Sequence, residues 1–371
     1  MDYYTLGNTG LRVSRLALGT MTFGEDWGWG ADESNSQALF NKYLEAGGNF
    51  IDTADMYTNG NSEKMLGQFI KDSGSRDRVA IATKFTFNAD PGNPNAGGNG
   101  RKNILRAVEG SLERLGTDYI DLYILHAWDQ ITPAAEVMRT LDDLVTSGKV
   151  RYVGLSDIPA WYAAQAQTLA QERHLEPISA LQLEYSLAER NIEFEHIPLS
   201  QNLGAGVMVW SPLASGLLSG KYKPSEGGTE GSGRLASLAG SGNPAFDKFT
   251  KKNWEIVAVL EEVARELDRS MAQVAVNWVV NRPSVASVLI GATKLHQLED
   301  NLGALEFEIP PELQQRLDDV SKPEVRFPYT FFEPSMQGMV TGGATIGDKP
   351  TGYYQPLRFE GSGAGTSASD S

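Results

Sequence analysis

Short apolar runs alternate with longer amphipathic segments along most of this chain. The short runs have the length and the apolar character of buried strands. Strands are predicted at Arg15–Gly19, Asn49–Asp52, Val79–Lys84, Ile120–His126, Val150–Ser156, Ile178–Leu183, Val207–Trp210 and Val288–Ile290. Apolar residues at spacings of three and four predict helices at Ser34–Ala46, Asn103–Leu115, Pro133–Thr146, Ala160–Gln171, Trp254–Leu267 and Met271–Asn281. Strands and helices in alternation indicate repeated βα units around a parallel sheet.

The number of units favours a closed barrel over an open sheet. Most successive strands start about one βα unit apart, and only the last two are separated by a much longer connection. A doubly wound dinucleotide-binding sheet needs a glycine-rich turn after its first strand, and the segment found there, GTMTFGEDWGWG, does not match that turn. The fold class predicted is therefore α/β, a (β/α)8 barrel of the TIM type.

We expect residues 1–320 to form the barrel. Two long loops, Phe85–Gly100 and Lys221 to about Pro244, follow strands, so they either shape a substrate pocket or are tolerated surface insertions. Residues 321–360 form a C-terminal extension whose aromatic run, Phe327–Phe332, is suited to cover the mouth of the barrel. Residues 361–371 are rich in Gly and Ser and are expected to be a flexible, disordered tail.

Composition and charge narrow the possible partners. The chain has 371 residues, with Lys+Arg 32 against Asp+Glu 47, and a formal net charge of −15 disfavours nucleic acid and anionic membrane surfaces. It contains no cysteine, and its four histidines are not at helical ligand spacing, so no metal site is expected. No secretory signal or long apolar segment is found, which favours a cytoplasmic protein without a membrane span.

Polar residues stand at or just beyond three neighbouring strand ends. Asp52 closes the second strand and Tyr57 follows it, Lys84 closes the third strand, and His126 closes the fourth. Each alone is explained by an ordinary role, such as a helix cap, a packed ring or a solvated strand end. Together they point to a site, because the carboxyl ends of barrel strands meet on one face.

Through these residues and the segments around them, the chain resembles the aldo-keto reductase family, and in particular its bacterial NADP-dependent members and the branch of channel β-subunits. The resemblance covers residues 1 to about 320 and is carried by a series of blocks in order: GLRVSRLALGTMTFG, GGNFIDTADMYTNGNSEKMLG, VAIATKF, DYIDLYILHAWD, GKVRYVGLSD, ISALQLEYSL, WSPLASGLLSGKY and VLIGATKLHQLEDN. It implies an (α/β)8 barrel and assigns the family's catalytic tetrad to Asp52, Tyr57, Lys84 and His126.

The residue types of that tetrad suit carbonyl reduction. An alkoxide left by hydride addition must receive a proton, and we expect it from Tyr57. The Lys84 ammonium is expected to lower the pKa of Tyr57, with Asp52 holding Lys84 in place. His126 is expected to orient the carbonyl by a hydrogen bond. The resemblance therefore implies NADPH-dependent, reversible reduction of an aldehyde or ketone to the alcohol.

The resemblance also implies the residues that hold the cofactor. Ser156, Asp157 and Gln182 are expected to bind the nicotinamide amide, and Trp210 is expected to stack on its ring. Gly19, Thr20 and Met21 are expected to contact the cofactor nearby. Asp157 departs from the family's frequent Asn, and a carboxylate can only accept, so its role is an open question. The residues expected to bind the pyrophosphate are Ser211, Leu213, Ser215 and Lys221. Those expected to bind the adenosine end are Gly291, Thr293, Lys294, Gln297 and Asn301.

Cofactor preference rests on one charged side chain. Lys294 offers the full positive charge of the adenosine block, and Thr293 stands where the family often has a second basic residue. NADP(H) is therefore preferred and NAD(H) is possible. For the substrate pocket we expect Phe23, Trp27, Phe85 and Trp128, with Met21, Trp29 and the Phe327–Phe332 run as further candidates, and such aromatic walls favour a bulky or cyclic carbonyl.

Two other functions stay open. The fold also serves regulatory subunits that bind nicotinamide cofactors and sense their redox state, and an intact tetrad does not distinguish these from reductases. A barrel hydrolase could use paired carboxylates, for example Asp52 with Glu184, if these faced each other at about 5 to 10 Å. That alternative leaves Tyr57 and Lys84 without a role.

Overall fold

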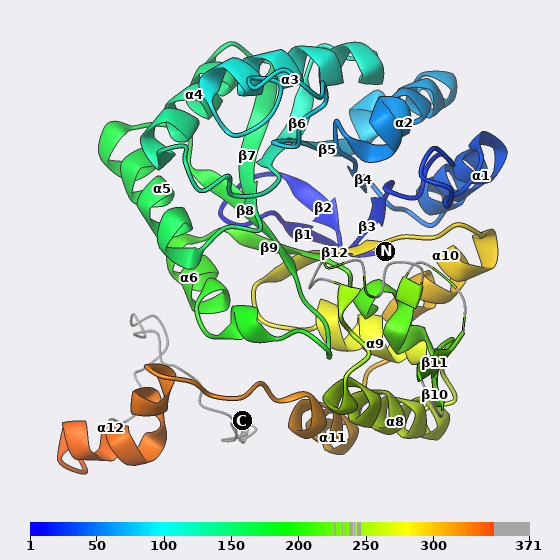
Figure 1. The fold of residues 1–371 in the computed structure, drawn as a ribbon, viewed down its shortest axis with the longest axis vertical. Coiled ribbons are helices and arrows are strands. Elements are labelled where there is room, and N and C mark those ends of the chain that lie inside the picture. Colours follow the sequence, from blue (N-terminus) through cyan, green and yellow to red (C-terminus); the bar gives the residue numbers. More distant parts are fainter. Residues whose placement is uncertain are drawn as a thin grey trace.

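Eight parallel strands close into a barrel in a computed structural model of the chain (Figure 1). The structure describes residues 1–344 except 226–227, 232, 234, 237–239, 241 and 243–245. Each strand pairs with its neighbours in the order β12-β3-β4-β5-β6-β7-β8-β9. The bounds are β3 (Leu16–Gly19), β4 (Phe50–Asp52), β5 (Ala80–Phe85), β6 (Ile120–Leu125), β7 (Val150–Ser156), β8 (Ile178–Glu184), β9 (Gly206–Trp210) and β12 (Val285–Ile290). The predicted (β/α)8 barrel is confirmed.

Helices surround the barrel because each buries one apolar stripe against the strands. Those between the barrel strands are α1 (Glu33–Glu45), α2 (Asn61–Ser73), α3 (Arg101–Leu115), α4 (Ala134–Thr146), α5 (Ala160–Arg173), α6 (His196–Leu203), α8 (Lys251–Glu266) and α9 (Met271–Val280). Beyond the last strand lie α10 (Leu295–Leu302), α11 (Pro311–Ser321) and α12 (Pro334–Thr341). Short 3-10 turns are η1 (Tyr57–Gly60), η2 (Arg76–Arg78), η3 (Asn191–Glu193), η4 (Ala214–Ser219), η6 (Gly303–Leu305) and η7 (Tyr329–Phe332). The helices thus alternate with the barrel strands along the chain.

A small apolar cluster fills the inside of the barrel. Alternate strand residues such as Phe50, Ala82 and Met208 point inward and are fully buried. Leu6 and Val13 join them from an antiparallel hairpin, β1 (Tyr3–Thr5) and β2 (Arg12–Ser14), which closes the end where the strands begin. The opposite end, where the strands finish, is left for polar side chains.

The loops that follow β5 and β9 differ in how they are held. The first, Phe85–Gly100, is tied to the barrel through Asn99, whose Oδ1 accepts a bond of 2.6 Å from Thr86 Oγ1 and whose Nδ2 donates to Ala127 O at 2.9 Å. In the second, β10 (Lys223–Ser225) pairs with β11 (Gly228–Glu230). Much of the rest of the loop up to Pro244 lies outside the described residues.

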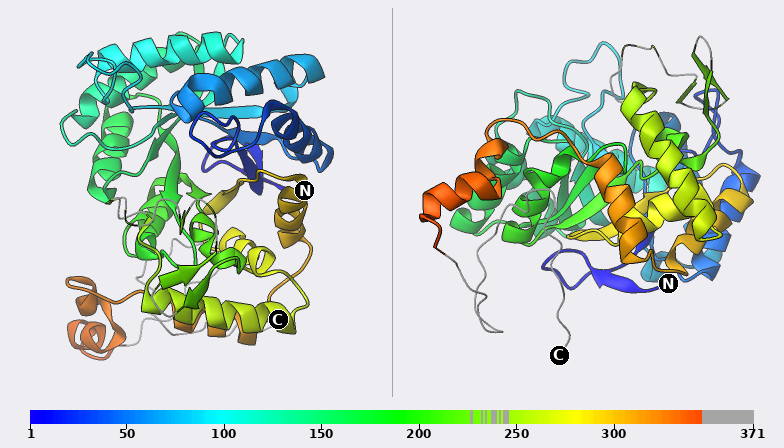
Figure 2. Two further views of the ribbon diagram at one scale, coloured as in Figure 1. Left: turned by 45° about the vertical axis from the view of Figure 1, so that its right-hand side comes forward. Right: turned by 90° about the horizontal axis from the view of Figure 1, so that it is seen from below.

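The described part of the C-terminal extension lies beside the barrel. Figures 1 and 2 show α12 projecting from the side of the molecule. The ring of Tyr329 stacks on Phe194 with centroids 4.9 Å apart, and its hydroxyl bonds Glu195. The aromatic run thus packs against the segment between β8 and α6, and its expected role as a cover over the barrel mouth stays a prediction. Residues 345–371, including the expected tail at 361–371, lie outside the described residues.

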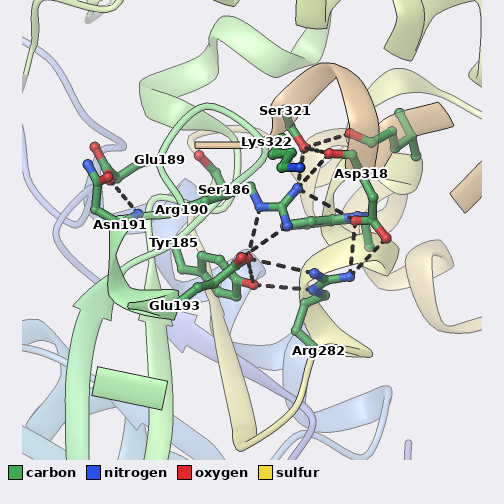
Figure 3. A network of polar contacts seen from close by, with 12 residues as sticks. Tyr185, Ser186, Glu189, Arg190, Asn191, Glu193, Arg282, Asp318, Ser321 and Lys322 are labelled. Carbon is green, nitrogen blue, oxygen red and sulfur yellow. Dashed lines mark hydrogen bonds and ion pairs between the residues drawn. The ribbon is translucent and has the colours of Figure 1, made fainter. Parts of the chain in front are cut away.

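A network of polar contacts joins the segment after β8 to the end of α9 and to α11 (Figure 3). Arg282 donates to both carboxylate oxygens of Asp318, at 3.1 and 3.3 Å, and to the Tyr185 hydroxyl at 3.2 Å. Arg190 pairs with Glu193 at 2.8 Å and donates to Ser321 Oγ at 2.7 Å. These contacts fasten α11 to the barrel. No helix among the described residues is long and apolar enough to cross a membrane.

Candidate active site

The polar residues at the open end of the barrel are set by strand alternation. A residue two positions beyond an inward apolar residue also points inward. In this way Asp52 follows Phe50, Lys84 follows Ala82, His126 follows Ile124, Gln182 follows Ala180 and Trp210 follows Met208. The apolar cluster therefore forms the floor on which these side chains meet.

Lys84 is the centre of the site. Its side chain is fully buried, and Nζ donates to Asp52 Oδ1 at 2.6 Å, to Thr53 O at 2.7 Å and to the Tyr57 hydroxyl at 3.2 Å. The other carboxylate oxygen of Asp52 accepts from Gln182 Nε2 at 2.7 Å. A buried ammonium needs such a set of partners, since removing it from water is costly. The structure thus brings Asp52, Tyr57 and Lys84 together as expected, with Gln182 as a further partner.

The turn after Tyr57 is strained. Thr58, Asn59 and Gly60 have φ of 44°, 56° and 86°, a left-handed conformation that costs free energy for residues with a Cβ. Thr58 Oγ1 offsets part of this cost by donating to Phe23 O at 2.8 Å and accepting from the Ser62 backbone N at 3.0 Å. The turn carries the Tyr57 hydroxyl back over Lys84.

Burial has the largest effect on the pKa of Tyr57. Burial raises the pKa of Tyr57 above its ordinary value, and the nearby Lys84 charge offsets only part of that rise. The expected lowering by Lys84 is therefore present as one contribution, but the net direction is upward. Burial alone would lower the pKa of Lys84, yet Asp52 and Tyr57 together raise it. Tyr57 is accordingly protonated at neutral pH and able to donate.

His126 lies beside Tyr57, with ring centroids 5.8 Å apart in an edge-to-face arrangement. Burial, with a smaller effect of the Lys84 charge, holds the pKa of His126 well below its usual range. The imidazole is therefore neutral at neutral pH and donates from one nitrogen only. Its Nδ1 is buried and has no hydrogen-bond partner in the described part of the chain.

Several groups around the tetrad fit a nicotinamide amide. Ser156 ends β7, and its buried hydroxyl has no hydrogen-bond partner among the described residues. Gln182 has its Nε2 committed to Asp52, so its Oε1 is the acceptor that it can offer. Thr20 is buried and bonds Asp52 O at 3.1 Å, while Gly19 and Met21 flank it at the end of β3. An unpartnered hydroxyl beside an amide acceptor suits a primary carboxamide.

Asp157 is held by the residue expected to stack on the nicotinamide ring. Trp210 Nε1 donates to Asp157 Oδ1 at 3.0 Å, and Asp157 itself has a φ of 46°. Desolvation of its carboxyl group inside the barrel mouth, with a further contribution from the Glu184 charge, raises the pKa of Asp157 to about 7. The premise that Asp157 only accepts is therefore too narrow, because near pH 7 a substantial fraction of the carboxyl groups carries a proton and can donate.

The chain after β9 forms a turn with several residues in the left-handed conformation. Ser211, Ala214, Ser215 and Gly216 all have positive φ, and Ser215 N donates to Ser211 Oγ at 2.9 Å. Successive backbone N–H groups in such turns form concave anion sites. Leu213 precedes η4, and Lys221 is exposed just after it.

The adenosine-end residues gather at the start of α10. Gln297 Oε1 accepts from the backbone N of Thr293 at 2.9 Å and of Lys294 at 3.2 Å. The side chain of Lys294 is exposed, as is Gly291, whereas Asn301 is buried. The structure thus leaves the Lys294 charge accessible to a phosphate.

Two of the expected pocket residues lie elsewhere. Phe85 is fully buried and packs on Tyr123 with centroids 4.9 Å apart, because it is the strand neighbour of the inward Lys84 and must face the helices. Phe23 is likewise buried, against Phe69. Trp27 does lie at the site, 6.3 Å from the Tyr57 ring, and Trp128 packs on Trp161 at 5.4 Å.

The sequence does not predict two residues that contact groups of the site, Phe87 and Lys248. The ring of Phe87 lies 4.8 Å from that of His126, edge to face, and is exposed. Loop residues have no periodicity, so the sequence held no signal for its direction. Glu184 pairs with the buried Lys248 at 2.9 Å. Lys248 comes from a distant loop without a motif.

Comparison with known proteins agrees with this geometry. The chain matches the aldo/keto reductase family over residues 15–322. The uncharacterized oxidoreductase YrpG of Bacillus subtilis strain 168 is 37% identical over 331 residues, 86% of this chain and 96% of the relative. A probable voltage-gated potassium channel subunit beta of Oryza sativa subsp. japonica is 36% identical, covering 87% and 98%. An aryl-alcohol dehydrogenase (NADP+) of Phanerodontia chrysosporium is 32% identical, covering 87% and 86%.

The family match and these relatives define a nicotinamide-dependent oxidoreductase. The chain belongs to the aldo/keto reductase family, whose members use nicotinamide cofactors. It is an NAD(P)H-dependent enzyme of that family.

Proposed function

We propose that this chain reduces an aldehyde or ketone to the alcohol with NADPH, reversibly. The observation that carries the proposal is the position of the Tyr57 hydroxyl, 3.2 Å from the buried Lys84 Nζ, with the Tyr57 ring 5.8 Å from that of His126. A carbonyl oxygen placed between Tyr57 and His126 meets a proton donor and a second hydrogen-bond donor. This is the arrangement that carbonyl reduction requires.

The chemistry divides between the cofactor and the protein. Ser156, Asp157, Gln182 and Trp210 would hold a nicotinamide cofactor, which would supply a hydride to the carbonyl carbon. Tyr57 gives its proton to the carbonyl oxygen, which completes the alcohol. The Lys84 ammonium stabilises the phenolate that this leaves, and Asp52 and Gln182 keep Lys84 aimed at it. His126 orients the carbonyl through its one N–H.

Preference for NADP(H) over NAD(H) rests on Lys294. Its charge is exposed at the start of α10, and the Phanerodontia relative is named for NADP+. Thr293 adds a hydroxyl but no second charge. We therefore expect a preference that NAD(H) can partly overcome.

The substrate that suits the site is a cyclic or aromatic carbonyl. The ring of Trp27 lies against that of Tyr57, and the ring of Phe87 lies against that of His126. Trp128 and Trp161 form another aromatic pair, and Trp161 is exposed. Aromatic faces of this kind bind flat apolar groups more strongly than they bind sugars.

A panel of carbonyls tests the function. NADPH oxidation is followed by absorbance with aromatic aldehydes, cyclic ketones, short alkyl aldehydes and sugars. We expect turnover, with the highest kcat/KM for aromatic and cyclic substrates. Turnover of sugars alone would overturn the substrate class, and binding of NADPH without turnover of any carbonyl would overturn the reductase.

A nicotinamide-sensing regulatory subunit is the second candidate, because one of the relatives is named as a potassium channel β-subunit. Slow turnover combined with tight cofactor retention and a stable partner protein would favour it. The hydrolase has less support. Asp52 is bound to Lys84 and Gln182, and Glu184 is paired with Lys248, so neither carboxylate is placed to activate water.

A further inference from the structure

A second cluster of buried charges lies directly behind the site, on the helix side of the barrel. Its acidic members are Asp55, two residues before Tyr57, and Glu63, which is fully buried on α2. Arg106 and Arg114 face them from α3, and the buried Tyr123 faces them from β6. Carbonyl reduction as proposed above uses none of these groups.

Glu63 ties this cluster to both catalytic segments. Its Oε1 accepts from Thr83 Oγ1 at 2.5 Å, and Thr83 is the strand neighbour of Lys84. Its Oε2 pairs with Arg114 Nε at 2.6 Å. Arg114 in turn supports the strained turn that starts at Tyr57, since a Cβ on Gly60 would lie 2.8 Å from Arg114 Cδ. Glu63 thus links Thr83, the neighbour of Lys84, to Arg114, which packs against Gly60 in the turn after Tyr57.

Asp55 differs from Glu63 in being incompletely paired. Its backbone N donates to Lys84 O at 3.1 Å, but its Oδ1 is buried and has no hydrogen-bond partner in the described part of the chain. A buried ionised oxygen without a partner is costly, whereas a carboxylic acid bears the same burial more easily. Two carboxylates beside Arg114 also repel each other.

We propose that Asp55 is a positioning residue for Tyr57, which supports the strained turn as a neutral acid and loosens it when it ionises against Glu63. The role rests on the proposed reductase function, since it acts through the Tyr57 proton transfer. Burial and the Glu63 charge raise the pKa of Asp55 to about 7, against the pull of Arg114 and Arg106. The rate of reduction therefore falls as the pH rises through that value.

Other titrating groups do not produce this fall. The pKa of Tyr57 is raised and that of His126 is lowered, so both titrate outside the range from pH 6 to 8. Asp157, whose pKa is also about 7, bonds Trp210 at the expected cofactor site, so we expect it to act mainly on cofactor binding, and its charge affects the pKa of Tyr57 less than Lys84 and Asp52 do. A kcat measured at saturating NADPH separates the two aspartates.

The test compares the wild type with Asp55→Asn, which has nearly the shape of the neutral acid. We expect the kcat of the wild type to fall by up to about tenfold per pH unit above the midpoint. The variant should keep its kcat within about twofold between pH 6 and pH 8, because its side chain carries no proton to lose. Asp121→Asn is the matched control, since Asp121 is a partly buried carboxyl with a raised pKa that is paired with Arg76 at 2.9 Å, away from the turn. It should keep the wild-type profile.

Thermal unfolding gives a readout that does not depend on activity. The folded chain holds the Asp55 proton more tightly than the unfolded chain, so stability falls as the pH rises from about 4 to about 7. Asp55→Asn should make the Tm less dependent on pH in that window. If that variant does not fold, Glu63→Gln serves instead, and it should move the decline in kcat to lower pH.

The outcomes separate this proposal from the reductase assignment. Normal turnover with the same pH profile in the wild type and Asp55→Asn, or with an unmoved midpoint in Glu63→Gln, overturns the positioning role alone. Absence of carbonyl turnover by the wild type at every pH overturns the reductase and the positioning role with it. A flat kcat profile with a reduced pH dependence of Tm supports the proposal.

Discussion

At the scale of single residues, alternation along the strands explains which of the expected residues the structure brings together and which it does not. Asp52 and Lys84 were placed at the site because polar residues at strand ends converge in a barrel. Phe85 was expected beside them, yet the residue next to an inward lysine must face the helices. Phe87 took its place from a loop, where no periodicity predicts direction.

Asp157 should make cofactor binding depend on pH. Its pKa of about 7 means that the protonated acid, which can donate as an asparagine does, is lost as the pH rises above that value. We expect the KM for NADPH to rise between pH 6 and pH 8, by at most about tenfold per pH unit above the pKa. Asp157→Asn should remove that rise and leave kcat nearly unchanged. A variant that retains the wild-type dependence of KM on pH would refute this role.

Lys294 should discriminate between the two cofactors. Lys294→Ala removes the charge expected to face the 2′-phosphate, which costs about tenfold or more in KM for NADPH and little for NADH. Lys221→Ala is the matched control, since a pyrophosphate contact is shared by both cofactors and its loss should weaken both alike. Equal losses for the two cofactors in Lys294→Ala would remove it from the 2′-phosphate role.

At the scale of elements, apolar periodicity predicts the strands and most helices, but it does not predict the polar contacts that join one element to another. The predicted helix at Met271–Asn281 is found at Met271–Val280, and its last turn leads into Arg282. That arginine reaches Asp318 on α11 and Tyr185 after β8, segments far away along the chain (Figure 3). Long-range ion pairs of this kind leave no pattern in a local window of sequence.

The network around Asp318 should contribute stability and not catalysis. Asp318 also accepts from Trp278 Nε1 at 2.9 Å, so Asp318→Ala leaves a partly buried arginine and an indole N–H without their acceptor. We expect a loss of about 1 to 3 kcal/mol in the free energy of unfolding, measured in urea, with kcat within twofold of the wild type. Asp319→Ala, at an exposed neighbour on the same helix, should change stability by less than about 0.5 kcal/mol. Equal effects of the two substitutions would contradict this account.

At the scale of the whole molecule, the barrel brings together side chains from distant parts of the chain. Asp52 and Gln182 are bonded although 130 residues separate them. Counting βα units predicted the closed barrel, but the meeting of Gln182 with Asp52, and of Glu184 with Lys248, follows only from its closure. The cofactor residues follow from the family resemblance, since the backbone conformation of turns such as η4 leaves no periodic pattern in the sequence.

The most direct test of the account is the reduction rate of Tyr57→Phe beside its affinity for NADPH. The substitution removes the proton donor and keeps the ring, so we expect kcat to fall by about a hundredfold or more. NADPH binding, followed by fluorescence, should stay within about threefold of the wild type because the expected cofactor contacts are untouched. A variant that binds NADPH and reduces its carbonyl at the wild-type rate would contradict the central claim that Tyr57 supplies the proton.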